Sequence, residues 1–211
     1  MIRYQLALLG HSQRWLPPSL LFAVLMGVLY ADPGTEVLPQ FAVSAGALAV
    51  VACWLTVALV DAEDPVQRLI TRVHARRLST VLGGIVGAVF ACCVLLTMLP
   101  LVWSSLSHQG NSVGALGIGA LAHLAGAGTG TAIGLPCSRL LVPRVGYTVL
   151  IAPVALAVVL LIRQLPLLNP MLRALTADSA SAGPLALALA TSAALLLLSA
   201  TAVGAVTRRR S

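Results

Sequence analysis

The residues with the most capacity for chemistry lie in one polar stretch, residues 61–77, with the sequence DAEDPVQRLITRVHARR. It holds three of the six acidic residues and four of the thirteen basic residues of the chain. The sequence shows no recognisable nucleophile–base motif and no H-E-x-x-H motif, and the cysteines and histidines lack metal-ligand spacing. We therefore expect neither a catalytic residue nor a metal site, and we interpret these charges as a binding surface.

A short amphipathic helix is predicted within residues 61–77. Asp64 stands where a capping side chain would, Pro65 suits the first helical position, and Gln67 is placed as a capping-box partner. Apolar residues at helical spacing form one face: Val66, Leu69, Ile70 and Val73. Arginines line another face: Arg68, Arg72 and Arg76.

His123 is the only titratable side chain in the middle of a long apolar segment. It is either a neutral histidine hydrogen-bonded across helices or, together with Thr129, part of a solute pathway. The nearby GAGTGTAIG, residues 126–134, has the glycine content of a phosphate-binding loop but lacks the G-K-[ST] ending. We interpret it as a helix-packing surface.

The composition predicts an all-α integral membrane protein with a single domain, residues 1–211. Apolar residues make up 59% of the chain and charged residues 9%, and the mean hydropathy is +0.98. A soluble fold of this length could not enclose so much apolar surface. Six segments have a length close to the roughly 20 residues that cross a bilayer. They are residues 15–31, 41–60, 78–103, 112–135, 147–162 and 184–206.

Two further segments are apolar but do not look like spans. Residues 1–14 predict an interfacial helix, with a frayed terminus as the alternative. Residues 163–183 are rich in leucine but interrupted by Pro166 and Pro170. We expect them to form a re-entrant hairpin or short helix that dips into the outer leaflet between the fifth and sixth spans.

The arginines beside the predicted spans indicate the topology. Eleven fall on one side and two on the other, so the positive-inside rule places both termini in the cytoplasm. They are scattered at the ends of apolar runs, which is a pattern for membrane topology and not for nucleic-acid binding. The absence of lysine is typical of GC-rich coding, and we expect a bacterial plasma membrane.

Glycines at four-residue spacing predict close packing between helices. Gly83 and Gly87 form a G-x-x-x-G pair in the third span. Gly126, Gly130 and Gly134 form a longer stripe in the fourth span. Such stripes let another helix backbone approach closely.

The layout of the whole chain resembles the permease subunit of an ABC-2-type exporter. The residues that carry the resemblance are DAEDPVQRLITRVHARRL at 61–78 and LAHLAGAGTGTAIGLPCSRLLV at 121–142. The resemblance implies that two permease subunits pair, and that ATP and Mg²⁺ bind a separate ATP-binding subunit and no cofactor binds this chain. It also implies a coupling helix that seats in a groove on that subunit. The coupling residues are then Asp61, Glu63, Asp64, Gln67, Arg68, Leu69 and Arg72.

Two functions therefore stay open. The first is an ABC exporter permease that moves a hydrophobic or amphipathic substrate and is not itself an enzyme. The second is a membrane module that works without ATP, such as a small-solute channel or an assembly and anchoring subunit. For residues 61–77, the alternative to docking is a solvated loop helix. The acidic residues before its start favour docking, because the positive-inside rule gives no reason for them.

Overall fold

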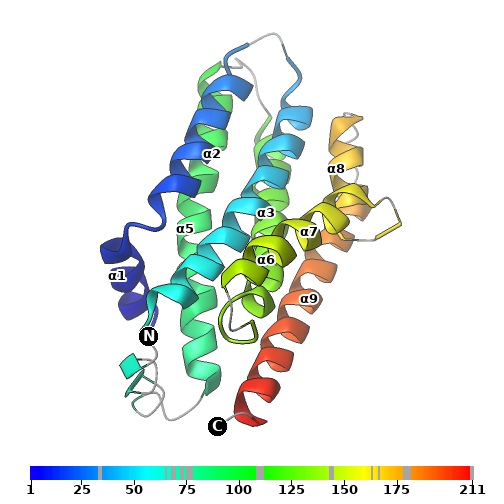
Figure 1. Ribbon diagram of the computed structural model, residues 1–211. Helices are drawn as coiled ribbons and strands as arrows, with labels where there is room; N and C mark the ends of the chain where they lie inside the picture. Colours follow the sequence, from blue (N-terminus) through cyan, green and yellow to red (C-terminus); the bar gives the residue numbers. More distant parts are fainter. Residues whose placement is uncertain are drawn as a thin grey trace.

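The protein is a bundle of helices in the part of the chain that the computed structural model describes (Figure 1). This part comprises residues 1–32, 35–64, 66–67, 70–71, 74, 78–107, 112–142, 145–162, 164–165, 167–177 and 182–209, and it contains no strand. The helices are α1 (Ile2–Ser12), α2 (Leu16–Leu29), α3 (Val37–Ala62), α5 (Leu78–Ser107), α6 (Val113–Cys137), α7 (Val145–Leu161), α8 (Asn169–Thr176) and α9 (Ala182–Arg209).

Four of these helices, α3, α5, α6 and α9, are long and apolar enough to cross a membrane. They have 25 to 30 residues, and at 1.5 Å per residue each exceeds the roughly 30 Å of hydrocarbon in a bilayer. The chain is thus a multi-pass membrane protein. The other two predicted spans are occupied by shorter apolar helices, α2 with 14 residues and α7 with 17.

Local sequence signals set several helix ends. The hydroxyl of Ser112 accepts a hydrogen bond from the backbone N–H of Ala115 at 3.1 Å and caps the start of α6. Pro17 and Pro18 occupy the first turn of α2, where a missing N–H costs little. Gln13, with a φ of 53°, ends α1 in the left-handed region, so the chain turns before α2 begins.

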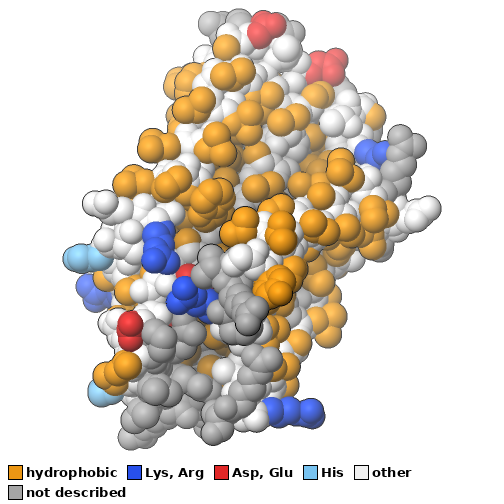
Figure 2. All heavy atoms as spheres, in the orientation of Figure 1, with side chains coloured by type: hydrophobic (Ala, Val, Ile, Leu, Met, Phe, Trp, Pro, Cys, Tyr) orange, Lys and Arg blue, Asp and Glu red, His pale blue; other side chains and the backbone are white. Residues whose placement is uncertain are grey.

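Helix α3 is the centre of the bundle. It contacts α6 most extensively and also packs against α1, α2, α5, α7 and α8. Figure 1 shows α2, α5 and α9 around this pair. The outer faces of α2, α5, α7 and α9 carry exposed leucine and valine side chains. Figure 2 shows a broad apolar surface on one face of the bundle. Such a surface suits contact with lipid.

The connection between α7 and α9 contains the short helix α8. Met171 and Leu175 on this helix are buried, and α8 packs against α3 and α9. The side chain of Asn169 donates a hydrogen bond to the carbonyl oxygen of Leu160 at 2.8 Å, which joins α8 to the end of α7. The sequence predicted a hairpin or a short helix here, and the described residues form a helix that lies on α3.

Candidate functional site

The carboxylate of Glu63 joins three segments that are distant in the sequence. Glu63 directly follows α3 and is only 5% exposed. Its Oε1 accepts hydrogen bonds from the hydroxyl of Tyr4, at 3.2 Å, and from the hydroxyl of Thr71, at 2.6 Å. The two hydroxyls are themselves 3.5 Å apart. A buried carboxylate requires such donors, so α1 and the helical residues after α3 are held to the end of α3.

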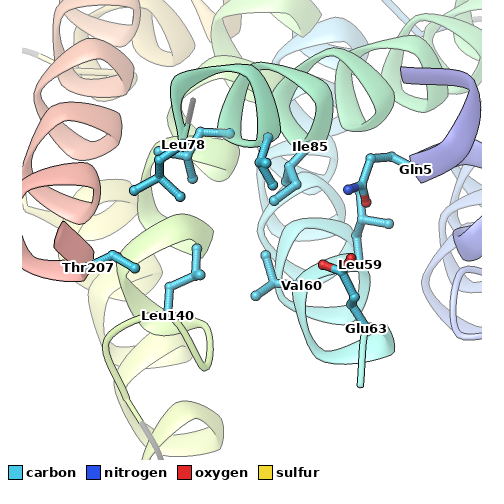
Figure 3. Close-up of a pocket in the computed structure, with 10 residues that line it drawn as sticks. Gln5, Leu59, Val60, Glu63, Leu78, Ile85, Leu140 and Thr207 are labelled. Atoms are coloured by element: carbon cyan, nitrogen blue, oxygen red, sulfur yellow. The ribbon is translucent and has the colours of Figure 1, made fainter. Parts of the chain in front are cut away.

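A small cavity lies beside Glu63, between α1, α3 and α5. Its volume is about 20 Å³, which is enough for one water molecule. Figure 3 shows Gln5 and Glu63 on the same side of this cavity, with Leu78 and Leu140 on the other. The side chain of Gln5 is buried, and its Nε2 has no hydrogen-bond partner among the described residues. The cavity therefore has polar Gln5 and Glu63 on one side and mainly apolar residues around the rest, and its size suits water rather than a substrate.

Asp61 forms a second polar connection, two residues before Glu63. Its Oδ1 accepts a hydrogen bond from the backbone N–H of Arg139 at 3.3 Å, and its Oδ2 lies 3.9 Å from Nε of the same arginine. Its carbonyl oxygen accepts a hydrogen bond from the guanidinium of Arg14 at 3.0 Å. The end of α3 is thus tied to the segment after α6 and to the turn between α1 and α2.

Asp64 acts as a helix cap, as the sequence predicted. Its Oδ1 accepts a hydrogen bond from the backbone N–H of Val66 at 2.9 Å. The described residues that follow are helical: Val66, Gln67, Ile70, Thr71 and His74. Pro65 and the predicted coupling residues Arg68, Leu69 and Arg72 lie outside the described residues, as do Val73 and Arg76.

The helical residues between 66 and 74 face two ways. Thr71 is 8% exposed and is bonded to Glu63, so this side faces the bundle. Val66 and Ile70 are 66% and 59% exposed, and Gln67 and His74 are also exposed. An amphipathic helix folded onto its own protein would bury its apolar residues. Here Val66 and Ile70 are exposed on the side away from the bundle, where they could contact a partner protein.

The acidic residues have roles within the chain that the sequence did not reveal. The prediction assigned Asp61, Glu63 and Asp64 to a coupling surface of this chain that would dock on an ATP-binding subunit. In the structure Asp61 meets Arg139, Glu63 is buried against Tyr4 and Thr71, and Asp64 caps a helix. The presence of these acids is accounted for without a partner, so it no longer argues for docking. The exposed apolar side chains are the stronger argument.

The glycine stripe of α6 lies directly on the backbone of α3, and we call this contact the α3–α6 seam. A Cβ atom at Gly126 or Gly130 would overlap the carbonyl oxygen of Ala45 or Ala49. At Gly134 it would lie 2.7 Å from the carbonyl oxygen of Cys53. Contacts of this kind exist only where the side chain is absent. Since both residue numbers rise by four from one contact to the next, α3 and α6 run parallel.

The second glycine pair packs differently from the prediction. Gly87 contacts the side chain of Ile2 in α1, at a position where an added Cβ would come within 2.7 Å. Gly83 has no atom within 4 Å of such a Cβ, and its neighbour Gly84 faces Met1 and Gln5 instead. The packing positions on α5 are therefore Gly84 and Gly87, and they receive the N-terminal helix rather than another span.

The two residues of the predicted pathway are bonded within their own helix. The Nδ1 atom of His123 lies 2.7 Å from the carbonyl oxygen of Gly119, and the ring meets Phe41 edge to face with centroids 6.1 Å apart. Thr129 donates to the carbonyl oxygen of Ala125 at 3.0 Å. Both side chains are fully buried, and neither lines the described cavities. This geometry fits packing between helices better than solute passage.

Several residues of the site carried no recognisable signal in the sequence. Tyr4 lies 59 residues from Glu63, and Arg139 lies 78 residues from Asp61. Thr71 falls among charged residues and looks like any solvated position. The one hint of a polar contact at the N-terminus was that the predicted interfacial helix carries Tyr4 and Gln5 beside its apolar positions.

No protein-family model, curated protein or solved structure matches this chain.

Proposed function

We propose that this chain is the permease subunit of an ATP-driven exporter, with ATP and Mg²⁺ bound by a separate subunit. In this proposal all six apolar helices cross a bacterial plasma membrane, and both termini are cytoplasmic. Two permease chains pair, and a hydrophobic or amphipathic substrate passes between them. The short helices α2 and α7 cross by local thinning of the bilayer, which costs fractions of a kcal/mol per Å of mismatch.

The observation that carries this proposal is the outward apolar face of the helical residues after α3. Val66 and Ile70 are exposed on a segment whose other side is fixed by Thr71 to Glu63. An exposed amphipathic helix of this kind fits a hydrophobic groove on a partner protein. Because the same segment is bonded to α3 and α1, a partner that moves it would also move the membrane helices.

The route for that motion follows direct contacts between described residues. From Thr71 it passes through Glu63 to Tyr4 in α1. From α1 it passes to α5, where Met1 and Ile2 pack on Gly84 and Gly87. Each step is a direct contact between described residues. The route gives the partner's closing motion a mechanical path to a long membrane helix.

The test is co-purification of this chain with ATP-binding subunits encoded beside its gene. We expect a stable complex, and we expect the double variant Val66→Ser, Ile70→Ser to reduce recovery of the ATP-binding subunit at least tenfold. Gln67→Ser, which changes an exposed polar residue of the same helix, is the matched control and should leave recovery unchanged. Equal recovery from the double variant and the control, or no complex at all, would contradict the proposal.

The second candidate is an assembly or anchoring subunit that works without ATP. The α3–α6 seam favours it, because backbone contact along the seam leaves no room for a solute between these two helices. The same contact argues against a solute path between α3 and α6. If an anchoring role holds, the double variant at Val66 and Ile70 should disrupt assembly with a partner that has no ATPase activity.

A further inference from the structure

The cavity beside Glu63 is lined by a buried hydrogen-bond donor, the side-chain amide of Gln5 in α1. Gln5 is 1% exposed, and its Nε2 atom has no hydrogen-bond partner among the described residues. Figure 3 shows the amide end of Gln5 directed toward the cavity, on the same side as the carboxylate of Glu63. A buried amide N–H without a partner is costly, because it has lost its hydrogen bonds to bulk water and gained none in return. An acceptor inside the cavity would remove that cost.

Glu63 places an acceptor on the same side of the cavity. Its Oε1 accepts hydrogen bonds from the hydroxyls of Tyr4 and Thr71, at 3.2 and 2.6 Å. A carboxylate has roughly four lone-pair sites on its two oxygens, so it can accept more than two hydrogen bonds. A molecule that joins the two groups must therefore accept from the amide of Gln5 and donate to the carboxylate of Glu63. Water does both.

The volume and the lining of the cavity limit what can occupy it. The volume is about 20 Å³, which is close to the space that one water molecule needs. Magnesium and calcium ions take about six or more oxygen ligands, and the three polar side chains of the lining, Gln5, Glu63 and Thr207, are too few. The other lining residues are apolar: Leu59, Val60, Leu78, Val81, Leu82, Ile85 and Leu140. These features favour a single water molecule over an ion.

We propose that one water molecule occupies this cavity and bridges Gln5 to Glu63. The water accepts a hydrogen bond from Nε2 of Gln5 and donates one to a carboxylate oxygen of Glu63. The bridge links α1 to the end of α3 beside the direct hydrogen bond from Tyr4. This site does not depend on the proposed export function.

Radiolytic labelling with synchrotron X-rays tests the proposal, because the hydroxyl radicals form from water and mark the side chains beside it. Leu59, Leu82 and Ile85 line the cavity and are at most 6% exposed, so bulk solvent labels them slowly. Leu48 and Leu135 are as well buried and line none of the described cavities. In the detergent-purified protein, mass spectrometry should show the three cavity residues labelled at least about fivefold faster than these two controls.

Variants of Gln5 show whether its amide holds the water. Gln5→Leu removes the donor and should lower the labelling of the three cavity residues to that of the two controls. Gln5→Asn keeps an amide and should retain most of the labelling. Gln67→Leu changes an exposed glutamine outside the cavity lining and should leave the labelling unchanged.

Two results would overturn the proposal. If the cavity residues of the parent protein are labelled no faster than the two controls, the cavity is dry. If their fast labelling persists in Gln5→Leu, the water is not held by the amide of Gln5.

Discussion

Helix α3 is held in two different ways along its length. On one face it meets α6 through the α3–α6 seam, where glycines lie against the carbonyl oxygens of Ala45, Ala49 and Cys53. At its end it meets α1 and the helical residues after it through the carboxylate of Glu63. The seam is held by close packing of two helix backbones. The polar end of α3, where Glu63 meets Tyr4 and Thr71, is held by hydrogen bonds. The seam therefore tolerates almost no movement, while hydrogen bonds at the polar end can open locally.

This difference suggests that the seam maintains the fold and the polar end of α3 can move. Packed backbones with no side chain between them open only when the whole bundle opens. A few hydrogen bonds near the membrane surface open locally, at a fraction of the global free energy of unfolding. The polar end is thus the place where a signal from outside the bundle can act without loss of the fold.

The largest effect is expected at the seam. Gly130→Ala places a Cβ atom against the carbonyl oxygen of Ala49 and 2.9 Å from the Cβ of Ala52, so α3 and α6 must separate. We expect a loss of about 3 kcal/mol in the free energy of unfolding. Titration of the detergent-purified protein with dodecyl sulfate measures this change.

Gly117→Ala is the control for this prediction. Gly117 lies on the same helix with no atom within 4 Å of an added Cβ. Alanine is the better helix former, so this variant should be as stable as the parent or more stable by up to about 1 kcal/mol. Equal destabilisation by the two substitutions would mean that the seam is not a tight backbone contact.

The sequence predicted the seam well and the polar end poorly, for a physical reason. The seam repeats every four residues, and a periodic pattern of small residues is visible in one dimension. The polar end joins Tyr4, Glu63 and Thr71, whose partnership depends on how α1 folds back onto α3 and α5. No local rule specifies that arrangement.

The helix lengths show a similar limit. Apolar runs predicted six spans, and the structure has four helices of membrane-spanning length with two shorter ones at the first and fifth positions. Hydropathy locates apolar segments but does not give the length of helix that each one forms. The predicted cap at Asp64 succeeded because it depends on three adjacent positions only.

The next largest effect is expected at Glu63. Glu63→Ala removes the acceptor of two hydrogen bonds, from Tyr4 and Thr71, and leaves those hydroxyls in a partly buried site. We expect a loss of about 2 kcal/mol, measured by the same titration. Glu63→Gln, which keeps an acceptor oxygen, should lose less than half as much. If the alanine variant were as stable as the parent, the cluster would not hold α1.

The smallest effect is expected at Asp61. Its contact with Arg139 is 3.9 Å long, and the arginine side chain is 42% exposed, so solvent screens the pair. We expect Asp61→Asn to cost at most about 1 kcal/mol. The cost should fall further when the salt concentration is raised from 0.1 M to 1 M. A cost that is larger than that of Glu63→Ala would reverse the order of the two connections.

The most direct test of the account is whether α1 responds to a change in the helix after α3. Thr71→Val removes the hydroxyl that donates to Glu63 and leaves the seam untouched. Hydrogen exchange followed by mass spectrometry should show faster deuterium uptake in peptides covering α1, and unchanged uptake in peptides covering residues 119–134 of α6. Unchanged uptake in α1 would contradict the claim that Glu63 couples the two segments.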